Sequence, residues 1–138
     1  MEISFVHSSS VVSLKRLRQA CEAVEDIAGK REGEVSVVFA DSEYMASLNK
    51  QYRGKEGATN VLAFPLGDEN SDADFLGGDI IVCEEKACSP EKQIRERCDE
   101  EIVYLVIHAL LHIYGYDHQT EDDFETMSAL ESQVWELL

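Results

Sequence analysis

The sequence is poor in basic residues. Its 138 residues include 12 Lys and Arg against 28 Asp and Glu, which gives a net charge of −16. From Cys98 to the last residue there are ten Asp and Glu and no Lys or Arg. Phosphate is repelled by such a surface, so the total charge alone argues against a nucleic-acid partner. Lys50, Arg53 and Lys55 nevertheless fall within six residues, and a local cationic patch is compatible with this clustering.

Long apolar runs and linkers are absent as well. No stretch approaches the roughly 20 apolar residues that span a bilayer, and the first residues lack a basic segment followed by a long apolar core. We therefore expect a cytoplasmic protein without a membrane partner. No internal repeat, low-complexity tract or proline-rich linker is present, so we predict a single domain over residues 1–138.

The four cysteines form no CxxC pair. They are Cys21, Cys83, Cys88 and Cys98. A reducing compartment argues against disulfides, so none is predicted. Cys83 and Cys88 could act as metal ligands, but we interpret both as small apolar residues.

Three segments have strand character and one has the apolar spacing of an amphipathic helix. The helix is predicted over residues 12–28. Residues 34–40 are rich in β-branched side chains and predict a strand, strand character resumes at 59–64, and a further strand is predicted within 75–83. The Gly77-Gly78 pair indicates a bend or a close backbone approach. Residues 67–74 are polar and acidic, which favours a hairpin-like loop.

Three further helices are indicated by their caps. Asp41 is expected to cap a helix that runs through Tyr52. The motif Ser89-Pro90-Glu91 predicts the start of a long helix, which Gly115 should end near residue 114. Thr120 is expected to cap a last helix over residues 121–138. Because the long helix is apolar on nearly every side between residues 102 and 113, we predict a small α+β fold with this helix buried at its centre.

Three of the four histidines lie within eleven residues, in the motif HALLHIYGYDH. His108 and His112 are four apart, so they share one face of the predicted helix. Gly115 lets the chain turn back and bring His118 round as a third ligand. Three imidazoles leave a tetrahedral ion one open position for water, as in catalytic zinc sites. Unpaired imidazoles on an apolar helix would be costly, so we predict one bound Zn²⁺, with nickel or another divalent transition metal as alternatives.

Other residues near this motif are less informative. Asp117 could orient a ligand imidazole or cap a turn, and both roles stay open. His7 lacks this context and is interpreted as an ordinary histidine.

The spacing of the three histidines and Gly115 coincides with that of metzincin proteases, HExxHxxGxxH. Those enzymes carry a glutamate general base where this chain has Ala109, which cannot take a proton, so a protease of that type is rejected.

The histidine motif resembles the signature of the YbeY family of bacterial endoribonucleases and rRNA-maturation factors, which is close to HGxLHLxGYDH. Ala109 and Ile113 are the departures from it. Upstream, Asn49, Arg53 and the segment TNVLAFP resemble the family's Asn, Arg and TDVLSFP-like strand. The segment LGGDI resembles the family's LGDI strand, with one residue more. These similarities extend over residues 41–138.

The resemblance implies a zinc-bound, single-strand-specific endoribonuclease in 16S rRNA 3′-end maturation and ribosome quality control. It also implies a mixed sheet flanked by helices, with the metal at the end of a cleft. The expected partners are single-stranded RNA and the small ribosomal subunit or its associated proteins, with no DNA partner. Asn60 and Ala63 replace the family's usual Asp and Ser, so no role is transferred to either residue.

Arg53 and His112 are the candidate catalytic residues, and His108, His112 and His118 are the candidate metal ligands. The planar guanidinium of Arg53 suits a bidentate contact with phosphate. Lys50 and Lys55 could add backbone contacts or form a solvated face. Two alternatives remain, a metal-dependent hydrolase of another substrate and a ribosome-assembly factor whose metal site is mainly structural. The general base is left open between Asp117, a metal hydroxide and the 2′-hydroxyl of the RNA.

Overall fold

Four strands of mostly apolar residues form one mixed sheet in the computed structural model, which describes residues 1–7, 9, 11–66, 75–88 and 98–138. The strands are β1 (Glu2–Val6), β2 (Glu32–Ala40), β3 (Val61–Leu66) and β4 (Phe75–Cys83). They are ordered β1-β2-β4-β3 in the sheet. The β1–β2 and β2–β4 pairs are parallel, whereas β3 and β4 are antiparallel.

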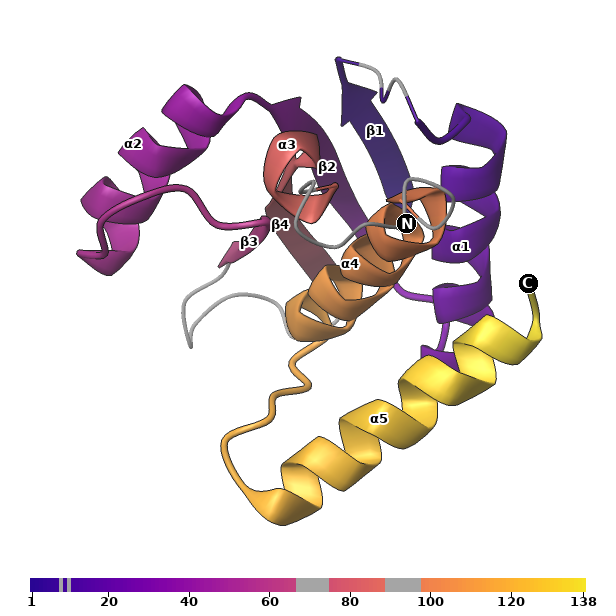
Figure 1. Cartoon of the computed structure of the whole chain (residues 1–138). Helices are drawn as coiled ribbons and strands as arrows, with labels where there is room; N and C mark the ends of the chain where they lie inside the picture. The colour runs from indigo at the N-terminus through magenta and orange to yellow at the C-terminus, as the bar shows by residue number, and fades with distance from the viewer. Residues whose placement is uncertain (8, 10, 67–74, 89–97) are drawn as a thin grey trace.

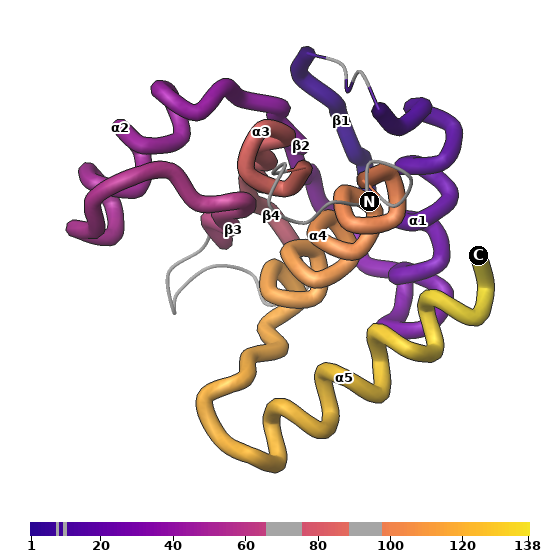
Figure 2. Tube along the Cα trace, in the orientation of Figure 1, coloured from indigo at the N-terminus to yellow at the C-terminus, as the bar shows by residue number. Residues whose placement is uncertain are grey.

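Helices cover both faces of this sheet (Figures 1 and 2). In the described part of the chain they are α1 (Leu14–Ala28), α2 (Ser42–Arg53), α3 (Glu84–Ala87), α4 (Cys98–Ile113) and α5 (Glu121–Glu136). The predicted α+β class is therefore confirmed. Among these helices, none combines the length and the apolar character that a membrane crossing requires.

The alternation of side chains along β4 creates two hydrophobic clusters. Ile80 and Val82 lie in the main core together with the buried residues of α1 and α4. Ile81 and Cys83 point to the other face, where they pack with Met45 of α2. This alternation is the ordinary period of a strand. The sheet is thus enclosed between α1 and α4 on one face and α2 on the other.

The central helix α4 lies against the sheet, as its apolar sequence predicts. Most of its side chains between Ile102 and Ile113 are buried. A Cβ placed at Gly78 of β4 would lie 2.5 Å from Cδ1 of Ile113 and 2.8 Å from the carbonyl oxygen of Phe64. The predicted close backbone approach at this glycine is confirmed. α5 packs on the outer side of α1 and α4 (Figure 1).

The predicted helix caps are confirmed. Backbone N–H groups donate to the side chain of Asp41 at the start of α2 and to that of Thr120 at the start of α5. Gly115 has a φ of 105°, a value that favours glycine, and it follows the end of α4. The helix start predicted at Ser89-Pro90-Glu91 and the loop predicted at 67–74 lie outside the described residues.

Three features differ from the prediction, two secondary-structure elements and one disulfide. The strand β1 and the short helix α3 had not been predicted. A disulfide joins Cys88 to Cys98, whose Cα atoms are 5.3 Å apart, so the prediction that no disulfide forms was wrong. Sequence spacing could not reveal this pair, because the packing of α3 beside the start of α4 brings the two cysteines together. Cys21 and Cys83 are buried free thiols, consistent with the apolar role assigned to Cys83.

Candidate metal centre and its cavity

The three histidines of the motif meet at the end of α4. The Nε2 atoms of His108 and His112, one helical turn apart, are separated by 3.1 Å. The chain turns at Gly115, and His118 approaches the same point from the following segment. One potential ligand atom from each histidine lies within 4.8 Å of the other two, and no other such group of three or more ligands occurs among the described residues.

The chemistry of this group fits a divalent transition metal. Zinc–imidazole bonds are about 2.0–2.1 Å long, so nitrogens that share an ion lie at most about 4.2 Å apart. One ligand nitrogen of each histidine lies within 4.8 Å of the other two, slightly beyond this limit. His108 and His112 are half-buried and His118 is exposed, so solvent can reach the group from one side. The three histidines could therefore hold a metal ion.

A glutamate from α5 orients the first of these imidazoles. Nδ1 of His108 lies 2.5 Å from Oε1 of Glu131, and both side chains are largely shielded from solvent, with exposures of 22% and 14%. An ionised carboxylate only accepts hydrogen bonds, so the proton of a neutral His108 belongs on Nδ1. The lone pair of Nε2 then faces the other two histidines. Such a carboxylate–histidine pair commonly orients a metal ligand.

The surroundings of His112 and Tyr104 favour the neutral forms of these two side chains. Burial, followed by the charges of His108 and His118, lowers the pKa of His112. Burial and the nearby Glu131 raise the pKa of Tyr104 to about 12. Tyr104 thus keeps its proton and donates from its hydroxyl to Oε2 of Glu131 at 3.2 Å. A neutral imidazole is the form that can bind a metal.

Asp117 has a local structural contact in this arrangement. Its Oδ1 accepts a hydrogen bond of 2.8 Å from the backbone N–H of His118. This contact matches the turn-capping role considered from the sequence. The carboxylate that touches a ligand imidazole belongs instead to Glu131.

A cavity of about 700 Å³ adjoins the three histidines and extends along β3 to the end of α2. A volume of this size is typical of small-molecule sites. Arg53 lines it together with the histidines, whereas Lys50 and Lys55 do not. Lys50 instead pairs with Glu56 at 3.7 Å on the surface. Within the described part of the chain, Arg53 has no hydrogen-bond or ion-pair partner.

Asn60 and Ala63 also line this cavity. They stand at the two positions where the sequence comparison above gives Asp and Ser as the usual residues of the YbeY family. The carboxylate implied by the resemblance is therefore replaced by a neutral amide in the wall of the cavity itself.

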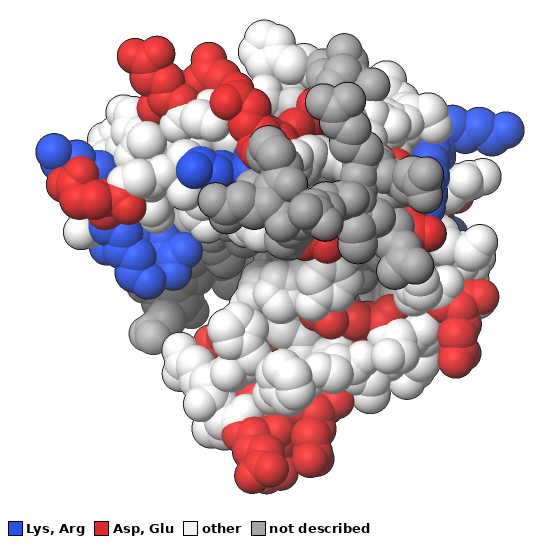
Figure 3. Space-filling model, in the orientation of Figure 1, with Lys and Arg blue, Asp and Glu red and all other residues white. Residues whose placement is uncertain are grey.

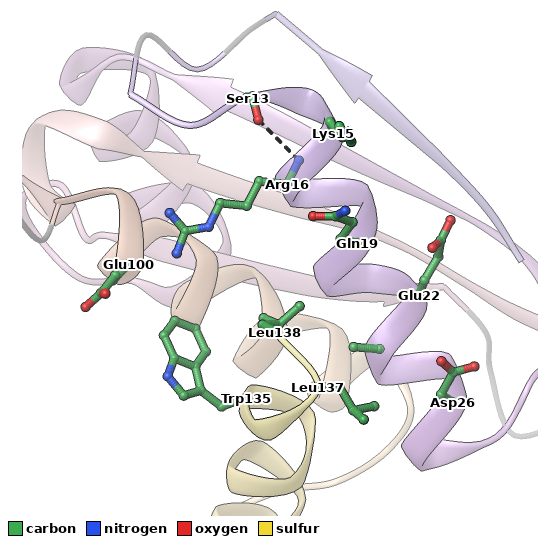
Figure 4. A pocket seen from close by; sticks show the side chains of 11 residues that line it. Ser13, Lys15, Arg16, Gln19, Glu22, Asp26, Glu100, Trp135, Leu137 and Leu138 are labelled. Carbon is green, nitrogen blue, oxygen red and sulfur yellow. Dashed lines mark hydrogen bonds between the residues drawn. The ribbon is translucent and has the colours of Figure 1, made fainter.

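A second hollow, of about 810 Å³, lies away from the histidines. It is lined by residues of α1, the start of α4 and the end of the chain (Figure 4). Its walls combine charged side chains of both signs with Trp135, Leu137 and Leu138. It contains no group of three metal ligands. The histidine cavity is therefore the better candidate for catalysis, although it is the smaller of the two.

Glu131 was not predicted from the sequence as a partner of His108. The two residues are 23 positions apart, so no local motif connects them. A signal was nevertheless present, because Glu131 lies four residues after Met127 and three before Val134, both buried. An acidic residue on the apolar face of a helix indicates a buried polar partner.

Comparisons with known proteins identify the family of this chain. The family model described as "Endoribonuclease YbeY" matches residues 3–138. An endoribonuclease YbeY of Alkaliphilus oremlandii is 39% identical, and the match covers 73% of this chain and 69% of the relative. That of Caldanaerobacter subterraneus subsp. tengcongensis is 34% identical, with coverages of 100% and 90%. The solution structure of TM1509 from Thermotoga maritima is similar at a TM-score of 0.63 and 27% identity, covering 97% of this chain and 89% of that one. The chain belongs to the YbeY endoribonuclease family.

Proposed function

We propose that the chain is a zinc-dependent endoribonuclease that cleaves single-stranded RNA, and that it acts in 3′-end maturation of 16S rRNA and in ribosome quality control. We further propose a single catalytic domain over residues 1–138, a cytoplasmic location, and small-subunit components as the partners that present the RNA. Membership of an endoribonuclease family supports an RNA substrate. The observation that carries the proposal is a cavity in which three convergent histidines lie together with an arginine.

The metal would be held by His108, His112 and His118. When bound, a divalent ion there supplies Lewis acidity toward a phosphoryl oxygen and lowers the pKa of a coordinated water. Imidazole suits zinc, nickel and other ions, and zinc is the proposal because three-histidine sites with an open position are typical of it. We assign His112 to catalysis because it would be one of the three ligands of this metal ion.

Arg53 would bind the phosphate. Its side chain is exposed, lines the cavity and has no ion-pair partner among the described residues, so its five N–H donors are available to a phosphate. Its planar guanidinium can donate two parallel hydrogen bonds to phosphate oxygens, and its charge favours the transition state, in which negative charge on those oxygens increases. Glu131 keeps the proton of His108 on Nδ1, which leaves Nε2 as the ligand atom.

The acidity of the chain favours a second candidate function, that of a ribosome-assembly factor. With a net charge of −16, the protein carries less basic surface than a strong RNA binder usually does. A ribosome-assembly factor whose metal site is mainly structural would agree with this charge. The two candidates differ in whether the purified protein cleaves RNA.

A comparison of variants on one defined substrate tests the proposal. Wild type, His112→Ala and Arg53→Ala are incubated with a short single-stranded RNA and with the same RNA annealed to its complement. Lys15→Ala serves as the matched control, because it removes one positive charge from α1, outside the cavity. Zinc is measured in each preparation. Loss of Arg53 should lower kcat/KM by about 100-fold or more, while His112→Ala should lose both the metal and the activity.

Three results would contradict the proposal. Equal cleavage by wild type and His112→Ala would indicate a contaminating nuclease. Full zinc content in His112→Ala would disprove the metal site. Cleavage by Arg53→Ala at the parental rate, with metal and fold intact, would remove the phosphate-binding role. Analysis of the product ends separates the possible nucleophiles, because a 5′-phosphate product excludes attack by the 2′-hydroxyl.

A further inference from the structure

An exposed tyrosine lies in the wall of the histidine cavity and has no assigned role. Tyr52, in the last turn of α2, is 60% exposed to solvent. It lines the same cavity as the three histidines and Arg53. Its hydroxyl has no hydrogen-bond partner in the described part of the chain. A large aromatic side chain exposed beside a candidate active site is a candidate for ligand contact.

The position of this ring is supported by a second aromatic residue. The ring of Tyr52 packs edge-on against that of Phe64, with centroids 5.2 Å apart and an interplanar angle of 62°. Phe64, on β3, packs in turn against the buried cluster that contains Met45 and Leu62. A ligand that stacks on Tyr52 would therefore meet a ring that is already held by its neighbours. Such preorganisation reduces the entropy that binding costs.

The charge near this ring identifies the kind of ligand. Arg53 follows Tyr52 in sequence, and Lys50 and Arg53 are the basic residues in the last turn of α2. In Figure 3, blue side chains lie on the side of the molecule where α2 lies, with red ones beside them, and also at the upper right, whereas the lower part of this face shows red side chains and no blue ones. A flat aromatic surface next to a cation suits a ligand that joins a planar ring to a phosphate. A nucleotide of single-stranded RNA has this chemistry.

We propose that Tyr52, supported by Phe64, is a stacking platform for a nucleobase of single-stranded RNA, next to the phosphate that Arg53 binds. This inference rests on the proposed function. It also provides a physical reason for single-strand specificity, because the bases of a duplex are stacked on each other and cannot stack on a side chain. Stacking on a single aromatic ring tolerates every base, so the platform contributes affinity without sequence selection.

The test measures stacking directly. Short single-stranded RNAs carry the fluorescent base 2-aminopurine at successive positions, and its quenching on binding to the zinc-loaded protein is recorded by stopped flow before cleavage. Wild type is compared with Tyr52→Ala and with Tyr52→Phe, the matched control that keeps the ring. Tyr52→Ala should weaken RNA binding by roughly 5- to 150-fold and abolish the quenching at one position. Tyr52→Phe should retain both, and all three proteins should contain equal zinc.

A second measurement needs no variant of the protein. An RNA that lacks the base at the quenched position should bind wild type more weakly, by a factor similar to that of Tyr52→Ala. This abasic RNA should bind wild type and Tyr52→Ala equally, because it lacks the base that would stack on the ring of Tyr52. Unchanged affinity for every abasic RNA would refute the platform, as would undiminished binding and quenching by Tyr52→Ala.

The outcomes separate this inference from the proposed function. If wild type cleaves single-stranded RNA but Tyr52→Ala binds and cleaves it equally well, the platform is wrong and the nuclease proposal stands. If wild type neither binds nor cleaves single-stranded RNA, both are wrong.

Discussion

Replacing Glu131 with glutamine tests whether α5 contributes to the metal centre. Oε1 of Glu131 lies 2.5 Å from Nδ1 of His108, and the contact is largely shielded from solvent. A glutamine has nearly the same shape, and its amide oxygen can still accept the hydrogen bond. The substitution therefore removes the negative charge while leaving a neutral contact in place.

The expected loss of zinc affinity follows from the difference between a charged and a neutral hydrogen-bond acceptor. A hydrogen bond to a charged group contributes about 1.5–3 kcal/mol, and a neutral one about 0.5–1.5 kcal/mol. The corresponding ends of these two ranges differ by about 1–1.5 kcal/mol, which corresponds to roughly 5- to 13-fold in zinc affinity. Glu131→Ala also removes the acceptor, so a loss nearer the upper end of the 10- to 100-fold range known for such partners is expected.

The assay is a competition titration against a chromophoric zinc chelator at pH 7. Glu136→Gln is the matched control, because it removes the same charge from an exposed position on the same helix. Tyr104→Phe removes only the hydroxyl that donates to Oε2 of Glu131, and it should have a smaller effect than Glu131→Gln. Thermal unfolding of the metal-free proteins separates loss of affinity from loss of fold. Parental zinc affinity in Glu131→Gln would refute the role of this carboxylate.

Three further predictions concern the stability of the fold. Gly78→Ala should lower the free energy of unfolding by about 1–3 kcal/mol in urea titrations, because the added Cβ overlaps α4 and β3. Asn49→Ala should cost about 1–3 kcal/mol in the same assay, because the buried amide donates to the carbonyl of Gly57 at 2.8 Å. Asp99→Asn should cost only about 0.2–1 kcal/mol at pH 7, because its ion pair with Arg16 is partly exposed. Arg16 lowers the pKa of Asp99 in the folded state, so this difference should persist at neutral pH and disappear as pH falls through that lowered pKa. Unchanged stability in any of these variants would contradict the corresponding contact.

The parts of the fold that depend on local sequence were predicted well. The caps at Asp41 and Thr120 were expected, because a side-chain oxygen next to free backbone N–H groups acts within one turn of a helix. The strand within residues 75–83 was expected from its run of apolar residues. β1 was missed because it is an edge strand with no fully buried side chain, so its sequence lacks a strong apolar signal.

The order of the strands and the disulfide could not be predicted. Both depend on which elements pack together, and no local pattern shows that β4 pairs between β2 and β3. The pairing of Cys88 with Cys98 depends in the same way on the position of α3 beside α4.

At the candidate site, the sequence by itself determined that His108 and His112 share one face and that Gly115 can reverse the chain, because both follow from the geometry of a helix and its end. Only the tertiary structure decided which groups surround them. Glu131 reaches His108 from α5, and the end of α2 brings Arg53 to the same cavity. These contacts join segments far apart in the chain, and the packing of helices on the sheet creates them.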